Sequence, residues 1–174
     1  MNTTVVEAVL NNVATLLPFR MVHSYERGVR FRWGKDIAEL SPGLHFFVPG
    51  IESIREVNVA PETRDLPTQS TYTKDGKNVT FSGNVCYRIV DARKMYVGVQ
   101  DFDEALVAFA MVHLAERIGS RTLAALRKDR ETLDVEIAET LSEKVAEWGA
   151  TIEWVGLTDL AETRAYRLFG DARL

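Results

Sequence analysis

The run from Lys77 to Val90 alternates apolar and polar residues, and an Asp-Gly pair stands directly before it. Asp75-Gly76 between residues 69–74 and 77–90 is the strongest short-range signal for a β-hairpin. The apolar face of the second arm holds Val79, Phe81, Val85, Tyr87 and Ile89. Gly83 interrupts this row, which predicts a bulge or a close approach of a neighbouring backbone. Because one face of the hairpin is apolar, another layer has to cover it.

Helices in the second half of the chain are predicted to supply that layer. Residues 91–96 form a short helix, and a longer helix begins at Asp101 and ends at Gly119. Ser120 or Thr122 opens a turn, and a helix from about Asp129 follows. This helix has apolar residues at steps of four, namely Leu133, Ile137, Leu141 and Val145. A strand over 151–157 and a helix over 163–169 complete the chain.

The first half reads as short strands. Val29, Phe31 and Trp33 alternate with arginines, and Gly34-Lys35 suits a type II′ hairpin loop. Further strands are expected over 36–40, 44–48 and 51–59, which together make a β meander. Strands first and helices later predict an α+β domain, in which antiparallel meander and hairpins are covered by helices from the second half.

The segment before these strands predicts a two-faced helix over residues 5–17. Thr4 and Glu7 form a capping box, and Pro18 ends the helix. Its apolar face holds Val5, Val6, Val9, Leu10, Val13, Leu16 and Leu17. The segment is too short and too polar to span a bilayer, and it lacks the features of a cleaved signal peptide. Its apolar face is expected to bind either a membrane surface or protein, the latter being the chain's own sheet or a neighbouring subunit.

The charge of the 174 residues is distributed unevenly. The formal net charge is −4, yet residues 1–35 carry five basic and two acidic residues and are therefore net +3. An acidic body with a small basic end argues against a nucleic-acid partner and favours an anionic membrane surface. The single cysteine, Cys86, excludes an intrachain disulfide and is compatible with a reducing compartment.

Several motifs, in order along the chain, resemble the SPFH or Band 7 domain of stomatins, prohibitins and flotillins. Together they cover about residues 22–160. The segments that carry the resemblance are 26–35, 40–49, 65–67, 73–76, 85–91, 118–119, 122–123, 130–131 and 148–149. The resemblance implies a non-enzymatic scaffold on one leaflet of a membrane, which self-assembles and recruits membrane proteases or channels. Members of the family usually carry a long coiled coil after this domain, and we expect none in residues 160–174.

Two sets of contact residues follow from this reading. For membrane contact we expect the seven apolar residues of the N-terminal helix together with Arg20, Arg30 and Arg32. Arg30 and Arg32 are also compatible with a solvated sheet face, on which their stems cover apolar surface. For subunit contact we expect the last long helix and the strand after it, through Glu139, Glu143, Lys144, Glu147, Ile152 and Trp154.

No pattern of catalytic or metal-binding residues stands out. His23, His45 and His113 have no metal-ligand spacing, and Cys86 lies within a strand without a base positioned beside it. We therefore expect no enzyme, no cofactor and no metal.

We expect a peripheral protein on the cytoplasmic face of a membrane. Residues 1–18 are the amphipathic helix, 19–160 the domain, and 161–174 a short helix or tail. The alternative is a soluble structural or adaptor subunit, for example of a virus or mobile element, that uses the same domain for protein assembly without membrane contact.

Overall fold

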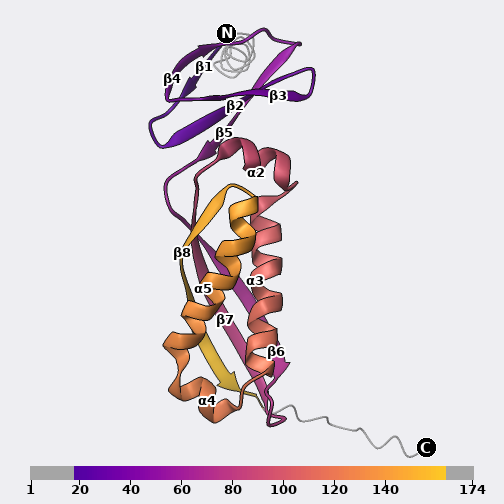
Figure 1. Ribbon diagram of the computed structural model, residues 1–174, viewed down its shortest axis with the longest axis vertical. Coiled ribbons are helices and arrows are strands. Elements are labelled where there is room, and N and C mark those ends of the chain that lie inside the picture. The colour runs from indigo at the N-terminus through magenta and orange to yellow at the C-terminus, as the bar shows by residue number, and fades with distance from the viewer. Residues whose placement is uncertain (1–17, 164–174) are drawn as a thin grey trace, which may run out of the picture. The chain divides into compact units, whose positions relative to one another are not determined.

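The computed structural model describes residues 18–163, which fold into two compact units (Figure 1). The first unit holds the described residues up to Ala60 and Ile89–Gln100, and the second holds Pro61–Arg88 and the chain from Asp101 onward. Antiparallel strands come first, helices follow and a last strand closes the order. The predicted α+β class is therefore confirmed.

The first unit contains five strands and one helix within its described residues. Their bounds are β1 (Phe19–Val22), β2 (Glu26–Arg32), β3 (Lys35–Leu40), β4 (Gly43–Phe46), β5 (Glu52–Asn58) and α2 (Ala92–Gly98). One sheet has the order β3-β2-β5, and β1 pairs with β4 in a separate two-stranded ribbon. The strands are antiparallel, as expected. Not all of them pair with their neighbours in sequence: β5 pairs with β2, on the edge opposite β3, and β1 pairs with β4.

Close packing at Gly28 joins the ribbon to the sheet. A Cβ atom at this position would lie 3.1 Å from Val22 Cγ2 and 3.2 Å from Leu40 Cβ, so only glycine fits without a shift. Val22 and Val29 are almost fully buried. This core fixes the ribbon against the three-stranded sheet.

The hairpin loop between β2 and β3 differs from the predicted one. Its two central residues are Trp33 and Gly34, with φ of 52° and 75°, and Arg32 pairs with Lys35. Positive φ at both positions is typical of a type I′ turn, whose twist matches the flanking strands. The predicted Gly34-Lys35 type II′ loop is therefore wrong by one residue, because Trp33 adopts the left-handed conformation that sequence rules reserve for Gly, Asn and Asp.

The second unit is a three-stranded sheet covered by helices. Its elements are β6 (Glu62–Tyr72), β7 (Asn78–Ile89), α3 (Phe102–Gly119), α4 (Leu123–Lys128), α5 (Arg130–Glu147) and β8 (Ala150–Glu162). The strand order is β6-β7-β8, so β7 is central. Helix α3 packs on β6, α5 packs on β8, and the two helices contact each other (Figure 1). The predicted Asp75-Gly76 hairpin is confirmed, and Gly76 has a φ of 74°.

The two long helices begin and end where the sequence indicates, and the Asp101 side chain accepts a hydrogen bond from Glu104 N at the start of α3. The turn predicted through Leu126 is instead the helix α4, which Thr122 caps by accepting a hydrogen bond from Ala125 N. Helix α5 buries all four predicted apolar residues, and Gly149 follows it with a φ of 78°. The last strand, β8, extends to Glu162 and is longer than expected. The helix predicted over 5–17, and that over 163–169 beyond Thr163, lie outside the described residues.

Both features considered for Gly83 from the sequence, a bulge and a close approach of a neighbouring backbone, are present in the structure. The pairing of β6 with β7 shifts between Leu66 and Gln69, opposite Gly83 and Phe81, so β6 carries one extra residue there. A Cβ atom at Gly83 would also lie 2.7 Å from the backbone oxygen of Gly156 on β8. Strands β7 and β8 therefore approach each other closely at this glycine.

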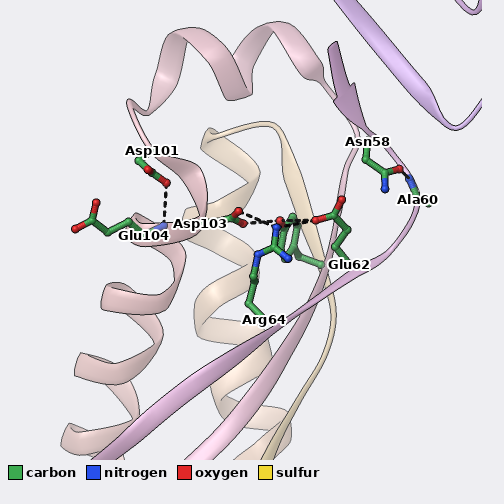
Figure 2. A network of polar contacts seen from close by, with 8 residues as sticks. Asn58, Ala60, Glu62, Arg64, Asp101, Asp103 and Glu104 are labelled. Atoms are coloured by element: carbon green, nitrogen blue, oxygen red, sulfur yellow. Dashed lines mark hydrogen bonds and ion pairs between the residues drawn. The ribbon is translucent and has the colours of Figure 1, made fainter. Parts of the chain in front are cut away.

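A polar network links β6, β7 and α3 at one end of the second unit. Arg64 donates hydrogen bonds to Glu62 and Asp103, both at 2.8 Å, as Figure 2 shows. The Tyr87 hydroxyl donates to Asp103 Oδ1 at 2.6 Å. Burial alone would raise the pKa of Asp103, but the hydrogen bonds from Arg64 and Tyr87 outweigh it and hold this pKa below its usual value. Ionised Asp103 therefore stabilises the fold.

We expect the stability to fall when Asp103 takes up a proton. A carboxyl group with a lowered pKa contributes stability that is present above its ordinary pKa and lost as the pH falls through its folded pKa. The stability of an Asp103→Asn variant should therefore fall less steeply than the wild type below about pH 4. Urea denaturation between pH 3 and pH 7 measures this, and equal slopes for both proteins would contradict it.

Candidate functional site

The β1–β4 ribbon presents a row of large apolar side chains to solvent. Phe19 pairs with Phe46 and Met21 pairs with Leu44 across the two strands. All four side chains are more than half exposed, whereas Val22, which alternates with Met21, is 2% exposed. We call Phe19, Met21, Leu44 and Phe46 the apolar face. Contiguous exposed apolar side chains of this kind mark a surface that binds a protein or a membrane.

The strand register produces this face, which is why sequence analysis missed it. Each strand contributes only two of the four residues, and β1 and β4 are separated by two other strands in the chain. The Phe19 and Phe46 rings meet edge to face with centroids 5.5 Å apart. Only the pairing of β1 with β4 brings the four side chains together. The local signal is weak: Arg20 separates Phe19 from Met21, and His45 separates Leu44 from Phe46.

A second exposed apolar group lies at the end of the β2–β3 hairpin. Trp33 is 75% exposed, and its backbone N–H donates to the backbone oxygen of Ile51 at 3.1 Å. Ile51 N–H in turn donates to Val48 O, and both residues are about 40% exposed. We call Trp33, Val48 and Ile51 the hairpin tip. A bulky residue with positive φ is strained, and such strain is concentrated at functional sites.

The three arginines expected at the membrane all make contacts within the first unit. Arg20 lies 3.5 Å from Glu56, and Arg30 donates to the backbone oxygen of Phe46 at 2.9 Å. Arg32 donates twice to Glu52 Oε1, at 2.9 and 2.6 Å. Arg20 lies on β1, between two residues of the apolar face, and Arg30 and Arg32 lie on β2. Arg30 bonds directly to Phe46, a residue of the apolar face.

Glu52 connects Arg32 with the hairpin tip. Its side chain is buried, and its Oε2 accepts a hydrogen bond from Val48 N at 3.1 Å. The hydrogen bond from Arg32, followed by that from Val48, lowers the pKa of Glu52. An ionised Glu52 therefore holds the loop that carries Val48 and Ile51.

The second unit has a groove between α5 and β8. It has a volume of about 540 Å³. Its lining consists of Asp134, Val135, Ala138, Glu139, Ser142, Glu143, Glu153, Trp154 and Val155. Val135 and Trp154 are 58% and 46% exposed. We call this the α5–β8 groove; its lining combines apolar and acidic side chains.

Three of the six residues expected at the subunit contact line this groove, namely Glu139, Glu143 and Trp154. Glu139 and Glu143 make no hydrogen bond or ion pair with another residue in 18–163, whereas Glu153 pairs with Arg88. Lys144 pairs with Glu147 at 2.5 Å on the same helix, and Ile152 is half-buried on β8. The structure thus gathers part of the predicted set around one concave surface.

Neither a metal site nor a membrane span is found in the described part of the chain. No group of three or more His, Cys, Asp or Glu residues in 18–163 is arranged to hold a metal ion. No helix within the same range has both the length and the apolar character needed to cross a bilayer. Cys86 is free and buried.

Comparison with known proteins places these features in a family. The sequence model of the SPFH domain / Band 7 family matches residues 20–167. An uncharacterized protein of Archaeoglobus fulgidus is 33% identical over 141 residues, which cover 81% of this chain and 57% of that protein. Mouse stomatin is 29% identical over 143 residues, covering 81% of this chain and 50% of stomatin. A stomatin homolog of Pyrococcus horikoshii is 30% identical over 141 residues, covering 81% and 53%.

The chain spans about half the length of these three relatives, and the match begins at β1 and includes both units of the structure. The resemblance noted in the sequence is confirmed: the chain belongs to the SPFH or Band 7 family.

Proposed function

We propose that this chain is a non-enzymatic scaffold that binds peripherally to one leaflet of a membrane and assembles with copies of itself. The exposed apolar face of the β1–β4 ribbon is the observation that carries the membrane part of the proposal. Transfer of its four half-exposed side chains out of water is worth on the order of 4 kcal/mol before ordering costs. This supports weak binding by the ribbon alone.

A second membrane contact would make the binding stable. The N-terminal segment, with Val5, Val6, Val9, Leu10, Val13, Leu16 and Leu17, directly precedes β1 and is proposed to lie in the lipid headgroup boundary. Arg20, Arg30 and Arg32 of β1 and β2 are proposed to add attraction to anionic lipid, about 1 kcal/mol for each charge that is not neutralised by its partner, Glu56 for Arg20 and Glu52 for Arg32. The apolar face and the N-terminal segment together would give stable membrane binding, which one contact alone would not give. Because the cytosol is reducing, the free thiol of Cys86 is compatible with the proposed position on the cytoplasmic face of the membrane.

Self-assembly is proposed to use α5 and β8. The supporting feature is the α5–β8 groove, in which Trp154 and Val135 expose apolar surface beside Glu139 and Glu143, which have no partner within residues 18–163. Strand β8 is also an edge of its sheet, and edge strands can pair with another chain, although Asp134 and Arg130 of α5 already bond to the backbone of Leu157. Subunits joined here would form the platform on which membrane proteins, such as a protease or a channel, are organised.

Flotation on liposomes tests the membrane role. We expect the full chain to float with vesicles containing anionic lipid, and a chain that begins at Pro18 to bind at least tenfold more weakly, because it keeps the apolar face and loses the N-terminal segment. Equal flotation of the two chains would remove the membrane role from that segment. Absence of flotation for the full chain would reject membrane binding.

A further inference from the structure

The α5–β8 groove has a chemistry that its own chain complements. Its lining includes the exposed apolar side chains of Val135 and Trp154 and the carboxylates of Glu139 and Glu143, which have no partner among residues 18–163. The segment after β8, residues 164–174, contains three arginines and one aspartate, with aromatic and aliphatic residues between them. Its apolar residues are Tyr166, Leu168, Phe169 and Leu174. A segment that carries both basic and apolar residues complements a groove lined by both acidic and apolar side chains.

The length of the chain decides which copy supplies the segment. The end of β8 is fixed, since Thr163 N–H donates to Asn78 O at 2.9 Å. Trp154 lies nine residues earlier on the strand, which is about 30 Å. Phe169 lies six residues beyond Thr163 and reaches at most about 22 Å. Phe169 could therefore touch Trp154 of its own chain only if the segment reversed at Thr163 and ran back along β8 fully stretched, so a second copy fills the groove more readily.

We propose that residues 164–174 of one copy bind in the α5–β8 groove of a second copy. Arg164 and Arg167 would pair with Glu139 and Glu143. Tyr166 and Phe169 would cover the exposed side chains of Val135 and Trp154. This inference rests on the proposed self-assembly and names the contact that produces it. Because donor segment and acceptor groove are different surfaces, the contact is head-to-tail, and repeated contacts give rings or filaments instead of closed dimers.

Charge reversal in the full chain tests the pairing. The groove variant carries Glu139→Arg and Glu143→Arg, the tail variant carries Arg164→Glu and Arg167→Glu, and a fourth protein carries all four substitutions. We expect the concentration at which the chain associates, measured by sedimentation velocity, to rise at least tenfold in each double variant. It should return to within about threefold of the wild type in the fourfold variant. This recovery would exclude misfolding as the cause of the loss.

A matched control carries Glu39→Arg and Glu104→Arg. Neither of these two exposed carboxylates lines the groove, and neither makes a side-chain hydrogen bond or ion pair within the described residues. This variant should associate like the wild type. Loss in the control, unchanged association in either double variant, or failure of the fourfold variant to recover would overturn the inference while the proposed scaffold stands. A wild type that stays monomeric in buffer, in detergent and on vesicles would reject both.

Discussion

Substitution of Gly83 by alanine is expected to lower the free energy of unfolding by about 2 kcal/mol, within the range for overpacking of a filled site. The new methyl group would lie 2.7 Å from the backbone oxygen of Gly156. A backbone atom cannot rotate away as a side chain does, so strand β8 has to move. Such movement disturbs the packing of α5 on β8.

Gly156 provides the matched control for this prediction. A Cβ atom there would meet only the Trp154 ring, at 3.7 Å, which is ordinary van der Waals contact. Gly156→Ala should therefore change the stability by less than about 0.5 kcal/mol, as is usual away from packed features. Urea denaturation of both variants measures the difference. A Gly83→Ala protein as stable as Gly156→Ala would show that the sheet has room for the methyl group.

The elements of the second unit are largely predictable because their signals are local. The Asp75-Gly76 turn, the Asp101 cap and the four-residue steps of α5 each lie within a short stretch of sequence, and each is confirmed. Gly83 is a similar case, since a gap in an apolar row is visible without knowledge of the partner strand. These features therefore do not depend on how distant parts of the chain pair.

The first unit is less predictable because its surface depends on pairing between distant strands. The sequence between β1 and β4 contains two other strands, and no local pattern indicates that Phe19 pairs with Phe46. The same holds for Glu52, whose burial beside Arg32 depends on the pairing of β2 with β5. Trp33 escaped prediction for another reason: its left-handed backbone is rare for a bulky residue.

Replacement of Met21 and Leu44 by glutamate is expected to weaken binding to anionic vesicles about 30- to 100-fold. These side chains form a cross-strand pair on the apolar face and are 57% and 64% exposed. Their transfer into lipid contributes about 1 kcal/mol each, and a charge in their place adds a desolvation cost, for a total of about 2 to 3 kcal/mol. Because both positions are exposed, the fold should remain stable. Vesicle sedimentation of the full chain gives the partition coefficient.

The control has to match the added negative charge, because anionic lipid repels any acidic variant. Tyr72 and Val112, which lie in the second unit, are 67% and 56% exposed, so Tyr72→Glu with Val112→Glu changes the net charge by the same amount. This control should lose at most about threefold in affinity, which is the part due to net charge alone. Equal losses in the two variants would show that general repulsion explains the effect. The apolar face would then have no special role, and membrane binding would rest on the N-terminal segment.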